Sequence, residues 1–213
     1  MIKNIDTRFD YGNMYNWTND LPENSIQDFL SVIDYINNNN QQKPKKRILE
    51  IGTFAGTSAI KLVELIKNAE ITVIDMWEDY NECDGIKGTV DKIKENHIEQ
   101  IFYNNIEKSG LKHLFTVKKG NSFNVLLDLN KSNSKFDVIY VDGSHTLLDS
   151  YTDILLSFEL LEKGGVMLID DVPFNKGDIL NSPLEGVKYF ADKHEKEMKI
   201  LHIGYRLFLE KII

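Results

Sequence analysis

The chain has 213 residues, with 33 acidic and 25 basic side chains, a formal net charge of −8, and 42% hydrophobic residues. This length and composition fit one folded domain with a full hydrophobic core, and they exclude a disordered chain. An excess of acid repels phosphate backbones, so we expect no nucleic-acid partner.

Cysteine and hydropathy patterns indicate the compartment. Cys83 is the single cysteine, so no disulfide can form within the chain, and this suits a reducing environment. No apolar run reaches the roughly 18–20 residues that span a bilayer, and the N-terminus lacks the apolar stretch of a signal peptide. We therefore expect a cytoplasmic protein without a membrane partner.

The first predicted element is a helix over residues 24–36, whose apolar side chains fall on one face. The polar tract 37–44 then breaks the pattern. It divides an N-terminal helical appendage, 1–42, from a main domain, 43–213. The short basic run at 43–47 is typical of a solvated linker.

The appendage is rich in large side chains, namely Phe9, Tyr11, Met14, Tyr15 and Trp17. They could form a lid that closes over a substrate and excludes water. They could equally pack on the sheet edge or form a contact in a homo-oligomer. The loop 80–89, with two glycines, is a second candidate for a moving segment.

Strands and helices alternate along the main domain. Strands are predicted at 47–51, 71–74, 114–117, 136–141 and 166–169, and helices at 58–66, 91–107, 122–129, 147–158 and 184–191. Gly164 and Gly165 are expected to close the fourth of these helices. Segments 198–203 and 205–212 flank Gly204 and predict a terminal hairpin.

Apolar strands separated by helices indicate a parallel sheet covered on both faces. The predicted fold is α/β: a doubly wound, mostly parallel, seven-stranded Rossmann-like sheet with a C-terminal antiparallel hairpin. Ligands bind such sheets at the carboxyl ends of the strands. Acids occupy those ends: Glu50, Asp75, Asp142, Asp170 and Asp171.

The loop after the first strand reads Glu50-Ile51-Gly52-Thr53-Phe54-Ala55-Gly56-Thr57-Ser58. Its glycines allow a sharp bend and a close approach to a ligand. It lacks the Gly-x-Gly-x-x-Gly fingerprint and the lysine of a P-loop. The acid before the first glycine would repel a pyrophosphate and attract an amine.

Asp75 ends the second strand, where a carboxylate can accept both hydroxyls of a ribose. The site therefore favours a nucleoside that carries positive charge. S-adenosylmethionine, with its sulfonium, amino group and adenosine, fits that description.

From about residue 47 onward the sequence resembles the class I S-adenosylmethionine-dependent methyltransferases. The motifs Ile74-Asp75-Met76-Trp77 and Val141-Asp142-Gly143-Ser144-His145 resemble the macrocin-type sugar O-methyltransferases, and more distantly catechol O-methyltransferase. The resemblance implies a methyltransferase acting on a small hydroxylated acceptor.

The resemblance also implies roles for single residues at the cofactor. Glu50 would bind the methionyl amino group, Gly52 would approach the cofactor, and Asp75 would hold the ribose. Trp77, Asn121 and Ser122 would flank the adenine, although Trp77 could instead be a core residue and Ser122 a helix cap. The other expected cofactor-binding residues are Thr53, Gly56, Ser58 and Asp142.

The acids after the fourth and fifth strands suggest a metal site. These strands should be neighbours, roughly 4.8 Å apart, so Asp142, Asp170 and Asp171 could converge. Three oxygen ligands with open positions suit Mg²⁺, and without a cation the carboxylates would repel one another. The resemblance implies the same trio. The alternative is that Asp142 and Asp171 only cap the elements that follow them.

His145 lies three residues after Asp142, at the mouth of the expected site. An imidazole has an ordinary pKa of about 6.5, which suits a general base near neutral pH. The resemblance implies that role, with the acceptor hydroxyl activated by Mg²⁺ and deprotonated by His145. A purely structural histidine is the alternative.

The sequence therefore predicts a Mg²⁺-dependent O-methyltransferase whose partner is a small-molecule or glycan acceptor, most readily a sugar hydroxyl. A catechol-like diol is the second acceptor class. A catalytically silent, cofactor-binding partner subunit is the alternative from another class of function. The metal-binding acids and His145 speak against it, because binding alone needs neither.

Overall fold

The computed structural model describes residues 8–10, 23–39, 43–77 and 97–213. The strands are β1 (Lys46–Ile51), β2 (Ala69–Asp75), β3 (Phe115–Lys119), β4 (Phe136–Val141), β5 (Leu161–Ile169), β6 (Met198–Ile203) and β7 (Leu207–Lys211). They form a seven-stranded sheet in the order β3-β2-β1-β4-β5-β7-β6. The first five strands pair in parallel and β7 pairs antiparallel with both β5 and β6. The predicted fold class and its terminal hairpin are thus confirmed.

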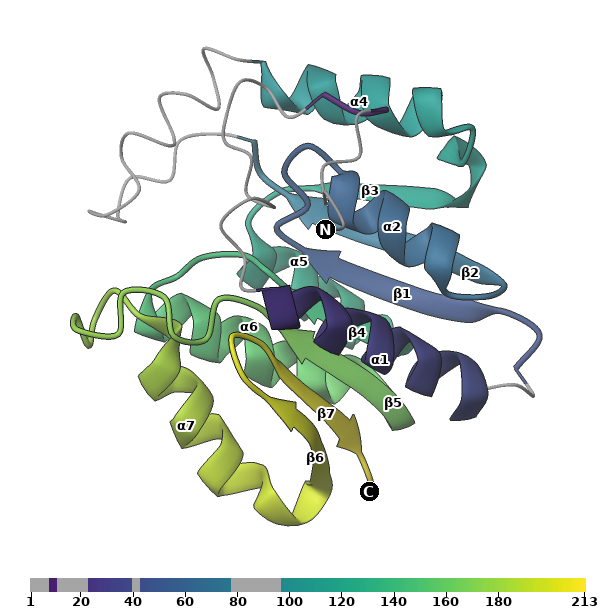
Figure 1. Ribbon diagram of the computed structural model, residues 1–213. Helices are drawn as coiled ribbons and strands as arrows, with labels where there is room; N and C mark the ends of the chain where they lie inside the picture. Colours follow the sequence, from purple (N-terminus) through teal and green to yellow (C-terminus); the bar gives the residue numbers. More distant parts are fainter. Residues whose placement is uncertain (1–7, 11–22, 40–42, 78–96) are drawn as a thin grey trace.

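Helices cover both faces of this sheet (Figure 1). They are α1 (Glu23–Asn39), α2 (Thr57–Leu65), α4 (Ile98–Ser109), α5 (Ser122–Lys131), α6 (Leu147–Leu160) and α7 (Pro183–His194). One core contains buried side chains of α1, α2 and α4, and a second contains those of α5, α6 and α7. Every strand except β3 contributes side chains to both cores, because side chains alternate across a sheet. In β1, for example, Ile48 belongs to the first core and Leu49 to the second.

The helix expected at 24–36 is longer than its pattern indicated, since α1 continues to Asn39. Its residues Val32, Ile33 and Ile36 are buried in the same core as α2 and α4. The Asn37 side chain bonds the backbone of Leu65 and Lys67 at the end of α2. The helical part of the N-terminal appendage therefore shares its hydrophobic core with the main domain.

The predicted role of Gly164 and Gly165 as a helix end is wrong. The helix α6 already ends at Leu160, and both glycines lie inside β5. They occupy an irregularity in the β4–β5 pairing, where the register shifts between Phe136 and Val138. Gly164 has φ +75°, a conformation that favours glycine, and a Cβ on Gly165 would lie 2.8 Å from a backbone oxygen. The glycines mark a bulge.

The remaining predicted elements agree with the structure to within a few residues at their ends. The helix predicted at 91–107 is described from Ile98 onward as α4, and the part before residue 97 lies outside the described residues. Among the helices of the described residues, none is long and apolar enough to cross a membrane.

Candidate active site

The sheet reverses its winding between β1 and β4, which are neighbours although two strands separate them in the sequence. Ligands of open α/β sheets bind at such a switch point, outside the carboxyl ends of the strands. Glu50, Asp75, Asp142, Asp170 and Asp171 all lie at or directly after these ends. The five acids therefore lie together at the carboxyl edge of the sheet, as their positions after the strands predicted.

Gly52 brings the first and fourth strands into close contact. Its φ is +82°, and a Cβ at this position would lie 2.0 Å from the carbonyl oxygen of Asp142. Only glycine can follow β1 here, because any side chain would collide with the backbone of the next strand end. This contact between backbones joins the two halves of the site, and the approach of Gly52 to the cofactor stays a prediction.

Glu50 is fully buried at the end of β1. Its Oε2 accepts a hydrogen bond of 2.7 Å from the Thr53 hydroxyl, while its Oε1 has no partner among the described residues. Burial raises the pKa of Glu50 from its ordinary 4.5 to about 7, against the lowering effect of the Ser58 and Thr53 hydroxyls. A buried carboxylate with a spare oxygen is suited to a ligand that brings positive charge.

The carboxylate of Asp75 is held by backbone amides from two segments. Phe54 N–H donates to Oδ2 at 2.8 Å and Trp77 N–H donates to Oδ1 at 2.9 Å. Burial raises the pKa of Asp75, and these amide bonds oppose the rise. The Met76 N–H is a third backbone donor to this carboxylate, and the lone pair that remains can accept a ribose hydroxyl.

The sequence allowed Trp77 either to bind adenine or to pack in the core. In the structure Trp77 is a core residue. The residue is 6% exposed, and its ring lies 4.9 Å from the Phe102 ring. Gly56 has φ +79° and also faces Phe102, whose ring lies 2.7 Å from the position of a Cβ. The glycine loop and α4 are thus packed together at the cofactor side of the site.

The turn before α5 brings the remaining expected cofactor residues to this edge. Gly120 N–H donates to the Asp75 carbonyl at 2.9 Å, which fixes the turn beside the end of β2. Asn121 is the N-cap of α5, without a side-chain capping bond, and Ser122 is the first helical residue. The Ser122 hydroxyl bonds Asp153 of α6. Ser122 is therefore no helix cap, and its position beside β2 is compatible with the expected adenine contact.

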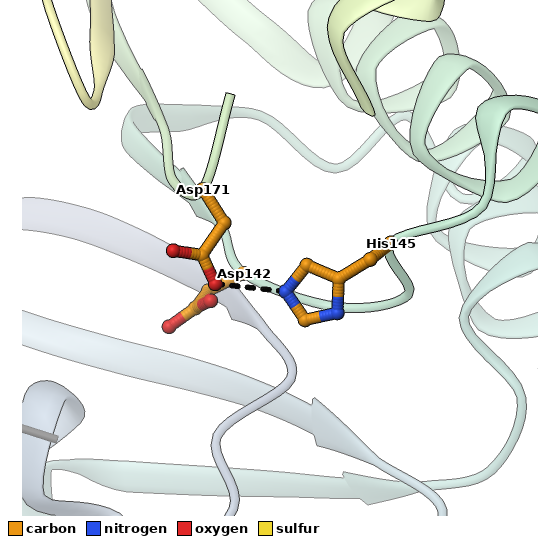
Figure 2. A group of neighbouring side chains, drawn as sticks. All are labelled: Asp142, His145 and Asp171. Atoms are coloured by element: carbon orange, nitrogen blue, oxygen red, sulfur yellow. Dashed lines mark hydrogen bonds and ion pairs between the residues drawn. The ribbon is translucent and has the colours of Figure 1, made fainter. Parts of the chain in front are cut away.

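Beyond β4 and β5, three side chains converge (Figure 2). One ligand atom each from Asp142, His145 and Asp171 lies within 4.8 Å of the others. His145 Nε2 is 2.8 Å from Asp171 Oδ2, the contact drawn as a dashed line. Asp171 has φ +51°, an uncommon conformation for a non-glycine residue that aims its carboxylate at the imidazole.

Charge is unbalanced within this group. Burial and the neighbouring carboxylates of Asp170, Asp171 and Glu50 raise the pKa of Asp142 well above its usual range, and Arg206 opposes them only partly. Burial alone would also raise the pKa of Asp171, but the hydrogen bond and charge of His145 reverse the effect and lower it. A cation placed between Asp142 and Asp171 would relieve the repulsion.

Asp170, expected as the third metal ligand, is directed elsewhere. Arg206 Nε donates to its Oδ2 at 2.9 Å, the Tyr140 hydroxyl bonds the same oxygen, and Oδ1 accepts the N–H of Asp171. Adjacent residues at a strand end point to opposite sides, so Asp170 and Asp171 separate. The group that the structure brings together contains His145 in place of Asp170.

His145 is enclosed from two sides. Its ring lies 4.6 Å from the ring of Phe174, and Nδ1 is buried without a hydrogen-bond partner among the residues that the structure describes. Nε2 is thus the nitrogen that faces the carboxylates. A small pocket beside it is lined by Asp142, Gly143, Ser144, Ser150 and Pro183, with further contributions from Val141, Ile169 and Asp170.

Sequence patterns did not identify Tyr140, Phe174 or Arg206 as site residues. Tyr140 lies in the apolar strand predicted at 136–141, where nothing in the pattern distinguishes it from its neighbours. Arg206 could have been identified from the sequence. A single cation at the start of an apolar strand indicates that a buried acid is its partner. Of the proposed lid, only Phe9 is described, and it is buried in the first core. Tyr11, Met14, Tyr15, Trp17 and the loop 80–89 lie outside the described residues.

Comparisons with known proteins agree with this architecture. Residues 49–172 match a family model described as a methyltransferase domain. Over 128 residues the chain is 30% identical to the O-methyltransferase hkm8 of Aspergillus hancockii, a match that covers 59% of this chain and 42% of the relative. The chain thus spans less than half the length of this curated relative.

Solved structures share the fold at low sequence identity. The O-methyltransferase TomG from Streptomyces achromogenes, in complex with SAM, has a TM-score of 0.62 at 17% identity, covering 86% of this chain and 80% of TomG. MycE from the mycinamycin biosynthetic pathway, in complex with Mg, SAH and mycinamycin VI, has a TM-score of 0.57 at 16% identity. That match covers 85% of this chain and 48% of MycE.

Proposed function

The chain belongs to the methyltransferase domain family, and from this premise we propose that it transfers a methyl group from S-adenosylmethionine to a hydroxyl of a small acceptor. The observation that carries the proposal is the arrangement of acids along one sheet edge. Glu50 and Asp75 lie at the ends of adjacent strands, and the group Asp142, His145 and Asp171 lies beside them. A nucleoside donor and a hydroxyl acceptor would meet where the two sets adjoin.

The first set suits the cofactor. Glu50 offers a buried oxygen without a described partner, which an ammonium group would satisfy. Asp75 keeps acceptor capacity for a ribose beside the glycine loop. The relative hkm8 is named an O-methyltransferase, and TomG was crystallised with S-adenosylmethionine, which supports the same cofactor here.

The second set fits a divalent metal ion. Asp142 and Asp171 would hold it, because their oxygens are close together and share more negative charge than Arg206 balances. Mg²⁺ prefers oxygen ligands and keeps open positions for water or substrate, and MycE carries Mg in its complex. A bound Mg²⁺ would lower the pKa of an acceptor hydroxyl and fix its position.

His145 is proposed as the general base. Its Nε2 lies on the carboxylate side, where the acceptor hydroxyl must enter, and the buried Nδ1 does not. Because Mg²⁺ favours oxygen over imidazole nitrogen, His145 stays free to take the proton. In the structure Nε2 is paired with Asp171 Oδ2, so it would take the proton once Asp171 binds the metal ion and leaves Nε2 with a free lone pair. Phe174 excludes water from one face of the imidazole. Holding the acceptor oxygen in line with the methyl group would contribute much of the rate.

A sugar hydroxyl, free or on a glycan or glycoside, is the proposed acceptor. The polar groups beside the pocket support a polyhydroxylated ligand, and MycE was crystallised with mycinamycin VI bound. One observation favours a catechol-like diol as the second acceptor class. Phe174 is 38% exposed, and its ring beside His145 could receive an aromatic ring.

Calorimetry tests the cofactor first. The protein should bind S-adenosylmethionine and S-adenosylhomocysteine, and Asp75→Ala should weaken both, since charge-assisted hydrogen bonds of about 1.5–3 kcal/mol each are lost. Assays with Mg²⁺ and a panel of glycosides and catechols should then yield a methyl ether, identified by mass spectrometry. Binding of NAD without binding of S-adenosylmethionine would refute the proposal. Cofactor binding with no transfer to any hydroxyl would instead favour the silent partner subunit.

A further inference from the structure

The loop after β1 is held by side chains from outside it. Four consecutive carbonyls, those of residues 53–56, already accept hydrogen bonds. Two of these bonds are ordinary backbone bonds: Gly56 N–H to Thr53 at 2.7 Å and Ile60 N–H to Gly56 at 3.0 Å. The other two come from side chains. Trp77 Nε1 donates to Phe54 at 2.8 Å and Asn105 Nδ2 donates to Ala55 at 2.9 Å.

Trp77 closes a ring of hydrogen bonds around Phe54. Phe54 N–H and Trp77 N–H both donate to the Asp75 carboxylate. The Trp77 indole N–H in turn donates to the Phe54 carbonyl. Phe54 and Trp77 have φ of +49° and +46°, conformations that persist only when the surroundings determine them. With its ring packed against Phe102, the Trp77 indole is occupied within the protein.

Asn105 supports the same loop from α4. Its amide is 2% exposed and makes three hydrogen bonds, which use both N–H donors and the carbonyl oxygen. It accepts from Asp10 N–H at 3.0 Å and donates to the Asp10 carbonyl at 2.8 Å and to the Ala55 carbonyl. One buried side chain therefore joins the cofactor loop to the N-terminal segment 8–10.

We propose that Trp77 and Asn105 are positioning residues, which hold the 53–56 loop in the shape that accepts the cofactor without touching the cofactor themselves. A loop ordered in advance loses less conformational entropy when a ligand binds, so the two side-chain bonds raise cofactor affinity. This inference rests on the proposed function, since it takes S-adenosylmethionine as the ligand of that loop. It assigns Trp77 a role that differs from stacking on adenine.

An isosteric replacement separates the two roles of Trp77. The variant carries 3-benzothienylalanine at position 77, which keeps the fused rings and has sulfur in place of the N–H donor. The probe is S-adenosylhomocysteine in a calorimetric titration, with melting temperature and circular dichroism measured on the same sample. We expect the dissociation constant to rise about tenfold, equivalent to about 1.4 kcal/mol. Unchanged affinity would overturn the proposal, because a stacking or core-filling ring would be intact.

Asn105→Leu tests the second contact and should raise the same dissociation constant about tenfold. The matched control is Glu64→Gln, which weakens the bidentate Arg8–Glu64 pair at 2.9 Å and leaves Asn105 in place. If Asn105 acted only by anchoring the N-terminal segment, both variants would weaken binding alike. We expect the control to stay within twofold of the unmodified protein, and an equal loss in both would overturn the role of Asn105.

The double variant, with 3-benzothienylalanine at position 77 and Asn105→Leu, measures the coupling. Since both side chains hold one loop, its loss of affinity should be smaller than the product of the single losses. A purely structural role would lower the melting temperature and leave the affinity of the folded protein unchanged, which would contradict the proposal. If the unmodified protein fails to bind S-adenosylhomocysteine, the proposed function fails and this inference falls with it. Normal binding in every variant refutes the inference alone.

Discussion

The two halves of the sheet edge differ in the groups that stabilise their carboxylates. At the cofactor edge, the ends of β1 and β2, Glu50 and Asp75 receive hydrogen bonds from neutral donors such as the Thr53 hydroxyl and backbone amides. At the acid edge, after β4 and β5, the carboxylates outnumber their cationic partners, and burial together with the neighbouring carboxylates raises the pKa of Asp142.

The two halves differ in how far the protein itself supplies partners for their acids, and at the cofactor edge only Glu50 Oε1 lacks one among the described residues. Hydrogen bonds within the protein hold the described residues of the cofactor edge, namely those to Asp75 and to the loop after β1. The acid edge is balanced only in part by Arg206 and His145. It therefore gains stability from any positive charge that arrives there, and this difference should separate the effects of metal and cofactor.

Metal removal is the change with the largest expected effect. Excess chelator should abolish methyl transfer and added Mg²⁺ should restore it, because the acceptor depends on the acid edge. Affinity for S-adenosylhomocysteine should survive, since the cofactor edge needs no metal. Mg²⁺ alone should also raise the melting temperature, and Asp142→Asn should remove that increase. Full activity in excess chelator would eliminate the metal from the mechanism.

Loss of the proposed base should have the next largest effect. His145→Ala should lower kcat by roughly 10²–10⁴-fold, the usual contribution of a positioned base, while cofactor affinity changes little. His145→Gln should not rescue activity, because an amide cannot take up the proton. Turnover and melting temperature are measured on one preparation. A variant of reduced stability with undiminished kcat would identify His145 as a structural residue.

Removing the buried cation of the acid edge should affect stability. Arg206→Met leaves Asp170 buried without its charged partner and should lower the free energy of unfolding by about 3–5 kcal/mol, measured by urea denaturation. Adding Asp170→Asn to this variant should recover part of the loss, because the unpaired charge is then gone. No recovery in the double variant would show that packing of the Arg206 side chain, which lies 5.7 Å from the Phe29 ring, matters more than charge.

The smallest expected effect concerns pH. Burial raises the pKa of Glu50 from 4.5 to about 7, so the native state holds a proton that the unfolded state releases over this interval. The free energy of unfolding therefore falls as pH rises from about 4.5 to 7. Above pH 7, Glu50→Gln should stabilise the fold by up to about 3 kcal/mol. Affinity for S-adenosylhomocysteine should rise with pH through about 7 in the unmodified protein and lose that dependence in Glu50→Gln.

Asp153 provides the matched control for this prediction. Burial raises its pKa to about 7 as well, but it lies on α6 and bonds Ser122 rather than the glycine loop. Asp153→Asn keeps a side-chain oxygen that can accept from the Ser122 hydroxyl, so it should change the pH dependence of stability in the same direction and keep the pH dependence of cofactor affinity. If both variants lose the affinity effect, Glu50 is not the group that meets the amino group of the cofactor.

Periodicity predicted the sheet well because each buried strand must be apolar and each covering helix must have one apolar face. It was less informative where a local signal had two meanings. The pair Gly164 and Gly165 is typical of a helix end and equally of a strand bulge, and only the pairing of β5 with β4 selects the second. The polar tract after residue 36 predicted a break in the helix. Helix α1 nevertheless continues to Asn39, because the Asn37 side chain hydrogen-bonds the backbone at the end of α2.

The sequence by itself determined the α/β class, the acids at the strand ends and the position of His145 near Asp142. These follow from chain connectivity, since every strand that runs the same way ends at the same edge. The tertiary structure alone decided that Asp170 turns to Arg206, that Asp171 meets His145, and that Trp77 and Asn105 hold the glycine loop. Those pairings join residues as many as 50 positions apart, and no local pattern encodes which buried donor will reach which acceptor.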